Sequence, residues 1–269
     1  MTPSQGMIDV IERAAFLAWP AAETDVWGPW TFRATSGVTR RANSVWLGGI
    51  VEGEITAGVA AAETFYRARG LPSIFQVSAR EETASLDRAL AARGYAREGE
   101  VAVQVAATER VRGAAPVHAT TGVTCEVLPT LTEAWLELSG TQGRYRGVEG
   151  IYEALLRRLG ARARFGLAQV EGRPAAVGLL VLDEATSWAG VFSMHTVPAF
   201  RRRGLGRALL TALADEARQE GARHLYLQVE VANAGAQRLY EAAGFVTHHH
   251  YHYRVEPHTT QDGPCANHC

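Results

Sequence analysis

Apolar positions along the chain follow helical and strand spacing in alternation. In the first half this pattern predicts helices at residues 7–19, 56–69 and 82–93, and strands at residues 27–33, 44–48, 73–77 and 100–106. Pro20 ends the first of these helices, and Gly70 caps the second. Residues 107–121 are rich in Ala, Thr, Gly and Pro, which indicates a linker.

The second half repeats the alternation and adds a hairpin. It predicts strands at residues 123–128, 165–170, 175–182, 188–196 and 247–255, and helices at residues 131–138, 151–159 and from 208 onward. The spacing Thr130-x-x-Glu133 is that of a capping box. Gly166 and Gly178 lie within strands, where a glycine marks a bulge or close packing.

The two halves share an order of elements and a short local pattern. Residues 90–95, LAARGY, occupy the place that residues 240–245, YEAAGF, occupy later. The first half therefore resembles a decayed copy of the second. We expect an N-terminal domain at residues 1–106, a linker at 107–121, a second domain at 122–256 and a flexible tail at 257–269.

Composition narrows the classes of function. The hydrophobic fraction is 47%, enough for a buried core, and the net charge of -1 provides no general attraction to nucleic acid or to an anionic membrane. All 27 basic residues are Arg. Three cysteines are too few for a disulfide framework, and the N-terminus lacks the pattern of a signal peptide, so we expect a cytoplasmic protein.

A basic turn with two glycines joins a predicted strand to a predicted helix at residues 196–207, TVPAFRRRGLGR. Gly204 and Gly206 let the backbone approach a ligand closely, and the first N–H groups of a helix have no partner within it. The turn also carries four arginines, Arg201, Arg202, Arg203 and Arg207. Together these features predict a phosphate or pyrophosphate site.

This turn and the block that follows it resemble the GNAT superfamily of acyl-CoA-dependent N-acyltransferases. The pyrophosphate loop of that family, Gln/Arg-x-x-Gly-x-Gly/Ala, is matched by Arg201, Gly204 and Gly206. Its second block, Asn-x-x-Ala-x-x-Leu-Tyr-x-x-x-Gly-Phe, is matched by Asn233, Ala236, Leu239, Tyr240, Gly244 and Phe245. A Rossmann fingerprint would need a third glycine, and a P-loop would need a Lys, which the chain lacks.

The resemblance covers residues 123–253 and, more faintly, the first half. It implies an α/β fold with a mixed sheet and two GNAT-like halves in tandem. The N-terminal half is degenerate, because residues 47–53 have no basic residue where the loop would lie. Only the C-terminal half would bind the cofactor.

The resemblance also implies acetyl-CoA as the acyl donor and assigns residues to it. In the family the pantetheine arm lies in a gap between two parallel strands, so by position the backbone of Met194, His195 and Thr196 would bind the arm and the thioester carbonyl. The pyrophosphate would lie against seven consecutive residues, Arg201, Arg202, Arg203, Gly204, Leu205, Gly206 and Arg207.

Two further residues come from the second block. Tyr240 aligns with the tyrosine that protonates the departing thiolate in many members, a role that suits a phenol with a pKa of about 10; packing against the cofactor edge is the alternative. Asn233 would hold the strand-to-helix turn or touch the cofactor arm.

The general base is left open between two residues. Some family members have a Glu at the position of Gln228, and this chain departs from that pattern. Glu230 lies two residues later and therefore on the same strand face. His195 is the rival, since an unshifted imidazole pKa of about 6.5 suits a base, although packing under the cofactor explains it equally well.

The acceptor loop that the family places between its first two helices contains Arg144 and Arg146, with no carboxylate between Glu137 and Glu149. Two guanidinium groups would pair with an anionic group of the substrate; the alternative is that both are solvated or bind the 3′-phosphate of CoA. We therefore expect a small amine that bears a carboxylate, such as an amino acid, which agrees with a loose resemblance to a group labelled as N-acetylglutamate synthases. Antibiotic and protein amines stay open, and so does a homodimer.

Residues 248–252 contain four histidines, but strand neighbours at i and i+2 are about 7 Å apart, too far for tetrahedral zinc. We expect no metal. Because this strand borders the acceptor cleft in the GNAT family, the resemblance implies that the histidine-rich run, with His248, His250 and His252 on one face, lines that cleft. Two other interpretations compete with an enzyme: a non-catalytic acyl-CoA sensor and an interaction scaffold. The presence of Tyr240 favours the enzyme, and the intact loop disfavours the scaffold.

Overall fold

The structure is a computed structural model that describes residues 5–50, 53–113, 122–141 and 145–257. By packing, the chain divides into two compact units that interleave along the sequence. Unit 1 comprises Met1–Ala18 and Val103–His248, and unit 2 comprises Trp19–Ala102 and His249–Cys269. The predicted domains at 1–106 and 122–256 are contiguous blocks, and that division stays a prediction.

Unit 1 is built on a mixed sheet with the strand order β5-β10-β9-β8-β7-β6. The strands of the chain that enter unit 1 are β5 (Ala96–Ala107), β6 (Val123–Leu128), β7 (Ala163–Val170), β8 (Arg173–Leu182), β9 (Trp188–Thr196), β10 (His224–Glu230) and β11 (Val246–Val255). The β6, β7, β8 and β9 ladders are antiparallel, and β9 pairs with β10 in parallel. The predicted α/β class with a mixed sheet is confirmed.

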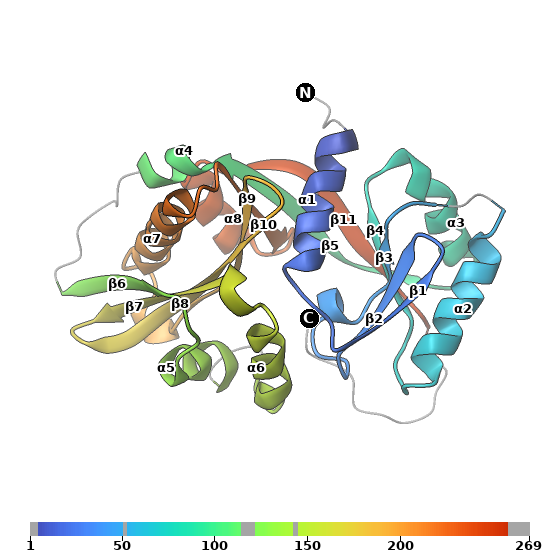
Figure 1. Ribbon diagram of the computed structural model, residues 1–269, viewed down its shortest axis with the longest axis horizontal. Helices are drawn as coiled ribbons and strands as arrows, with labels where there is room; N and C mark the ends of the chain where they lie inside the picture. Colours follow the sequence, from blue (N-terminus) through green and yellow to red (C-terminus); the bar gives the residue numbers. More distant parts are fainter. Residues whose placement is uncertain (1–4, 51–52, 114–121, 142–144, 258–269) are drawn as a thin grey trace. The chain divides into compact units, whose positions relative to one another are not determined.

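Helices cover both faces of this sheet (Figure 1). Those of unit 1 are α1 (Gln5–Leu17), α4 (Thr108–Gly113), α5 (Glu133–Leu136), α6 (Glu149–Arg157), α7 (Leu205–Gln219) and α8 (Ala234–Ala242). Helices α4, α7 and α8 lie on one face, and α5 and α6 lie on the other. A π-helix at Glu137–Thr141 continues α5.

Helix α7 is amphipathic and buries one side against the sheet. Its buried residues recur every three or four positions: Leu205, Leu209, Leu210, Leu213, Ala214 and Ala217. Gly166 of β7 pairs with Gly178 of β8, and a Cβ on either glycine would come within 3.0 Å of a leucine of α7. The two glycines therefore allow close packing, as the sequence predicted.

On the other face, Trp135 of α5 spans the same glycine pair. Its indole Nε1 donates to the carbonyl oxygens of Gly166 at 3.1 Å and Gly178 at 3.2 Å, and the side chain is fully buried. The cap of α5 is Thr132, whose hydroxyl accepts from the N–H of Trp135 at 3.3 Å. The predicted capping box at Thr130 is wrong, because the helix begins two residues later than the spacing suggested.

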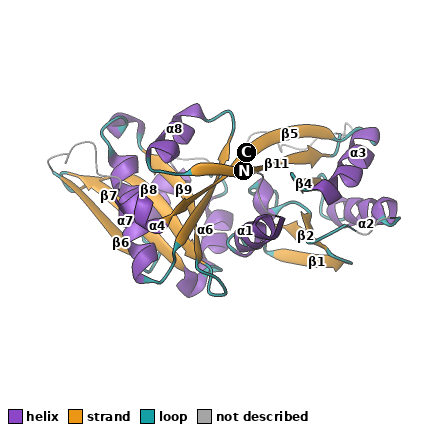
Figure 2. Cartoon of the chain, turned by 90° about the horizontal axis from the view of Figure 1, so that it is seen from above, coloured by secondary structure: helices purple, strands orange, loops and turns teal. Residues whose placement is uncertain are grey.

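Unit 2 holds a three-stranded antiparallel sheet of β1 (Glu23–Trp27), β2 (Trp30–Ala34) and β3 (Trp46–Leu47). It also holds β4 (Ile74–Ser78), which pairs with β11 in the strand order β4-β11-β5. Figure 2 shows β5 and β11 as two long neighbouring strands. Helices α2 (Ile55–Arg67) and α3 (Ala84–Ala92) complete the unit. Its core is aromatic: Trp30, Phe32, Phe65, Tyr66, Phe75 and Tyr95 are buried together.

Two local expectations differ from the structure. Residues 27–33 form the end of β1, a turn at Gly28 with φ 54°, and most of β2, because Gly-Pro interrupts the strand pattern. Residues 108–113 of the expected linker form helix α4, which packs on α7. Its Val111 is fully buried, so one apolar residue in a polar, glycine-containing segment carries the packing. Most of the expected tail lies outside the described residues.

Candidate functional site

Strands β9 and β10 separate at their C-terminal ends. Their parallel ladder runs from Trp188↔His224 to Val191↔Leu227, whereas β9 continues to Thr196 and β10 to Glu230. Backbone N–H and C=O groups must find partners, and a strand edge that has left its neighbour can bind an extended chain. The gap between the two strand ends is therefore a ready site for an extended, amide-bearing ligand.

Strand β9 also bulges at this point. Leu179 of β8 pairs with Phe192, and Val177 pairs with His195, so three steps along β9 match two along β8. Ser193 takes up the extra residue with a left-handed φ of 49°. A bulge re-aims the backbone that follows it, here residues 194–196, which border the gap.

The basic turn follows β9 directly and opens helix α7. Arg202 and Gly204 have φ of 64° and 77°, and Gly204 is the N-cap of α7. The first helical bond runs from the N–H of Ala208 to the carbonyl of Gly204, so the preceding N–H groups have no partner within the helix. Such a series of N–H groups at a helix N-terminus forms an anion site.

Positive side chains surround these N–H groups. Arg201, Arg202 and Arg203 are exposed, and Arg207 is half-buried, with burial lowering the pKa of its guanidinium. The guanidinium of Arg203 lies 5.6 Å from the ring centre of Phe200. These N–H groups and positive side chains lie just beyond the strand gap and suit an anion; their assignment to a pyrophosphate stays a prediction.

Helix α8 lies against the same loop. A Cβ on Gly206 would come 3.1 Å from Cδ2 of Leu239, a tight contact, so the glycine lets α8 approach the loop closely. The next residue, Tyr240, is 8% exposed, and its ring lies 6.0 Å from that of Phe245. Asn233 caps α8 by accepting from the N–H of Ala236 at 3.1 Å, which supports its expected role in the strand-to-helix turn.

The two candidate bases differ in environment. Glu230 is half-buried at the last position of β10, where it borders the gap. His195 is on β9; its Nε2 is buried and has no hydrogen-bond partner among the described residues. Burial and, less strongly, the charge of Arg201 lower the pKa of His195, so its imidazole is neutral at physiological pH.

Sequence comparison identifies the family. The family model described as "Probable histone acetyltransferase Rv0428c C-terminal" matches residues 6–254. The chain belongs to this family. Among curated proteins it is similar to "Uncharacterized N-acetyltransferase YobR" of Bacillus subtilis (strain 168), with 29% identity over 250 residues that cover 91% of this chain and 97% of that protein.

A shorter similarity points to a second enzyme. Over 83 residues the chain is 45% identical to ribosomal protein bS18-alanine N-acetyltransferase of Escherichia coli (strain K12), which covers 30% of this chain and 53% of that enzyme.

Solved structures share the fold. A GCN5-related N-acetyltransferase from Kribbella flavida has a TM-score of 0.66 at 17% identity and covers 95% of this chain and 97% of its own. A tandem GNAT protein from the clavulanic acid biosynthesis pathway has a TM-score of 0.63 at 15% identity, covering 80% and 74%. The GNAT resemblance is confirmed, and the chain is an acetyltransferase of GNAT type.

Helix α6, on the sheet face opposite α7, contacts the bulge in β9. The Tyr152 hydroxyl lies 2.9 Å from Oγ of Ser193, and the Tyr145 and Tyr152 rings stack at 3.7 Å. Sequence reasoning missed both Tyr152 and Ser193. Nothing in the local pattern marks a serine as left-handed, and Tyr152 reads as an ordinary core position of a helix.

The structure describes only one of the two predicted acceptor residues. Arg144 lies outside the described residues. Arg146 is exposed, and its charge contributes to the lowered pKa of Glu149, after the hydrogen bond that Glu149 accepts from the N–H of Gly147 at 2.8 Å. The structure therefore brings Arg146 near a carboxylate and shows no contact that assigns it to a substrate.

The histidine-rich strand β11 divides between the two units. His252, in unit 2, bonds Asp87 at 2.8 Å and is buried, whereas His250 is exposed and His248 is half-buried. Arg254 donates to the same Asp87 from Nε at 2.7 Å and from Nη2 at 3.0 Å. His252 thus belongs to the cluster around Asp87 in unit 2. These contacts do not support its expected place in the acceptor cleft. In the described ranges no three metal-ligating side chains gather.

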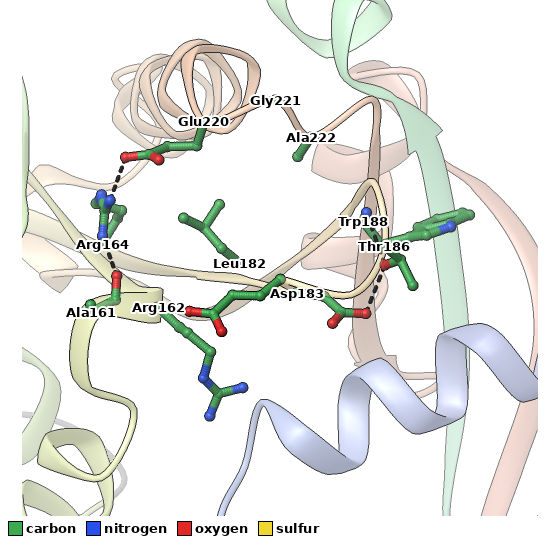
Figure 3. Close-up of a pocket in the computed structure, with 11 residues that line it drawn as sticks. Ala161, Arg162, Arg164, Leu182, Asp183, Thr186, Trp188, Glu220, Gly221 and Ala222 are labelled. Carbon is green, nitrogen blue, oxygen red and sulfur yellow. Dashed lines mark hydrogen bonds and ion pairs between the residues drawn. The ribbon is translucent and has the colours of Figure 1, made fainter.

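A cavity of about 240 Å³ lies at the far end of α7 from the basic loop (Figure 3). Arg164, on its wall, donates to the carboxylate of Glu216 at 3.0 Å, to that of Glu220, and to the carbonyl of Ala161 at 2.7 Å. These contacts occupy its guanidinium, so the cavity belongs to a structural ion-pair network. Within the described part of the chain, no helix combines the length and apolarity that a membrane span needs.

Proposed function

We propose that the chain transfers an acetyl group from acetyl-CoA to the primary amine of a small, carboxylate-bearing acceptor such as an amino acid. One observation supports this most strongly. The β9–β10 ladder stops several residues before either strand ends, and the basic turn of α7 begins immediately beyond the end of β9. A donor with an amide-bearing arm followed by a pyrophosphate matches this arrangement, in which an open strand edge is followed by an anion site.

The donor would lie along main-chain atoms for most of its length. The backbone of Met194, His195 and Thr196 would bind the pantetheine arm and polarise the thioester carbonyl. The N–H groups and side chains of residues 201–207 would bind the pyrophosphate. Because main-chain groups do this work, the sequence of β9 is free to vary where the geometry is kept.

The reaction exchanges one bond for another and moves two protons. The acceptor nitrogen forms a C–N bond with the thioester carbon, the C–S bond breaks, and the sulfur leaves as thiolate. The nitrogen attacks as a neutral amine and gives up one proton as the amide forms, and the thiolate takes one. We assign proton donation to Tyr240 because it matches the tyrosine of the family motif; it directly follows Leu239, whose side chain lies against Gly206 of the loop.

The base is one of two groups. Half-buried Glu230 borders the strand gap and would act directly or through water. His195 has a neutral imidazole with a buried Nε2, and a buried nitrogen with no partner is costly unless a substrate supplies one. The pH profile of the two variants separates these alternatives.

The acceptor assignment rests on Arg144 and Arg146, whose guanidinium groups would bind a carboxylate in bidentate geometry. A protein α-amine is the second candidate, because a segment of 83 residues is 45% identical to an enzyme named for the alanine amine of a ribosomal protein. We further propose, from the cysteine count and the net charge of -1, a cytoplasmic enzyme that binds neither nucleic acid nor membranes, with a homodimer as the assembly to test.

The proposed function is tested with the purified chain, acetyl-CoA and a panel of primary amines, following free thiol. We expect thiol release that depends on the acceptor and is fastest with amines that carry a carboxylate. Arg146→Ala should raise the acceptor KM, whereas Arg157→Ala, on α6 and paired with Glu153, should not. Donor binding with no acceptor-dependent thiol would identify a sensor, and polyamines as the best acceptors would overturn the assignment of the acceptor.

A further inference from the structure

Ser193 has a backbone conformation that serine rarely adopts. Five non-glycine residues in the described ranges have positive φ, namely Ser36, Thr39, Glu171, Ser193 and Arg202. The other four lie in turns or next to short helical turns, whereas Ser193 lies inside a strand. A left-handed serine in a strand persists only where its surroundings hold it.

The consequence of this conformation is local and falls on the donor site. The bulge at Ser193 shifts the register between β8 and β9, so that Val177 meets His195 and Leu179 meets Phe192. The three residues after Ser193 are those that border the gap between β9 and β10. A straight strand would point the N–H and C=O groups of these residues elsewhere.

The partner strand is adapted to the bulge. A Cβ on Gly178 would come 2.6 Å from the sulfur of Met194, so a glycine leaves room for the displaced methionine. Gly178 accommodates the bulge but does not fix the torsion angle of Ser193. The group that contacts Ser193 itself comes from the opposite sheet face.

That group is the hydroxyl of Tyr152, 2.9 Å from Oγ of Ser193. Tyr152 is fully buried on α6, and its ring stacks on Tyr145 at 3.7 Å with an interplanar angle of 19°. The stack fixes the ring, and the ring fixes the hydroxyl. A partner held in place fixes the position of the Ser193 Oγ. Because Oγ is joined to the backbone through Cβ alone, this restricts the conformations that the Ser193 backbone can adopt.

We propose that Tyr152 is a positioning residue for acyl transfer: its hydroxyl holds Ser193 in the left-handed conformation and thereby aims the backbone of residues 194–196 at the acyl thioester. The inference rests on the proposed function. Tyr152 acts through Ser193 and does not touch the reacting atoms. Pyrophosphate binding at residues 201–207 does not depend on it.

The test compares loss of the Tyr152 hydroxyl with substitutions that change the backbone freedom of Ser193. Tyr152→Phe keeps the stacked ring and removes the hydrogen bond, so kcat/KM for acetyl-CoA should fall about tenfold, mainly through kcat. The Kd of CoA, measured by calorimetry, should change less than about twofold, because the loop carries most of that affinity. Ser193→Ala should be as slow as Tyr152→Phe, and the double variant should be no slower than either.

Rescue distinguishes positioning from packing. Glycine adopts positive φ without a partner, so Ser193→Gly in the Tyr152→Phe background should recover at least about threefold in kcat/KM. Tyr95→Phe is the matched control. It removes a buried hydroxyl of unit 2 that lies 2.6 Å from Ser73, and it should leave kcat/KM unchanged whatever it does to the melting temperature.

The outcomes distinguish the positioning role from the proposed function. A parent that transfers acetyl, with Tyr152→Phe equally fast, or with additive losses and no rescue by glycine, contradicts the positioning role and leaves the proposed function standing. A parent that binds CoA and transfers to no amine contradicts the proposed function, and the positioning role with it.

Discussion

Nε of Arg201 donates a hydrogen bond of 3.1 Å to the carbonyl oxygen of Thr196, the last residue of β9. The strand edge and the basic loop are therefore joined by a side chain as well as by the chain itself. In the proposed function, the edge binds the arm of the donor and the loop binds its pyrophosphate. The bond links the two parts of the proposed donor site, which one ligand would occupy together.

Tyr240→Phe should lower kcat about 100-fold, the low end for loss of a general acid, with little change in the acetyl-CoA KM. The ring stays buried beside Phe245, so the fold should be kept. Steady-state kinetics at saturating acceptor measure this. A variant as fast as the parent would show that the thiolate leaves without help from Tyr240.

The acidic limb of the pH–rate profile should identify the base. Because burial and Arg201 lower the pKa of His195 below 6.5, a His195 base would stay active through neutral pH and lose activity only in more acidic solution. His195→Ala would then remove that limb. If Glu230 is the base, Glu230→Gln removes it and His195→Ala does not. The ionisation of the acceptor itself is common to all variants, so the comparison is internal.

Stability should fall on acidification through the cluster around Asp87. The hydrogen bond from Arg254 lowers the pKa of Asp87 to about 2, from an unfolded value near 3.8. A depressed carboxyl pKa stabilises the fold above the unfolded value, and the stabilisation is lost as the pH falls from about 4 toward 2. Burial lowers the pKa of His252, so its protonation also favours unfolding.

Asp87→Asn should therefore cost about 1 kcal/mol at pH 7, allowing for partial solvent screening, and progressively less below pH 4. Urea unfolding at a series of pH values measures the difference. Asp25→Asn, at an exposed position of β1, serves as the control with little effect. A constant difference between Asp87→Asn and the parent down to pH 3 would contradict the linkage.

The features that could be read from the sequence are those with a local cause. Glycine spacing and a run of arginines marked the start of α7, the spacing after Asn233 marked α8, and Gly166 and Gly178 marked close packing. Each of these depends on residues a few positions apart. The GNAT fold followed from the first two together.

The remaining features depend on partners far apart in sequence. A strand pattern records which side chains are buried but not which strand lies alongside, so the interleaving of the two units through β5 and β11 left no mark. Ser193 is left-handed, and its hydroxyl contacts that of Tyr152, 41 residues earlier. The buried Val111 that turns residues 108–113 into a packed helix is likewise explained only by α7.

Calorimetry of CoA binding to glycine variants of the basic loop is the decisive measurement for the donor site. In Gly204→Val/Gly206→Val, one side chain is strained at φ 77° and the other presses on Leu239, and both obstruct the N–H groups at the start of α7. Gly172→Val, at a hairpin turn with φ 75° and open space, is the matched control. We predict that the double variant stays folded and binds CoA at least about 30-fold more weakly, a loss of about 2 kcal/mol, while the control binds like the parent. Unchanged CoA affinity in the double variant would contradict the assignment of residues 201–207 as the donor site.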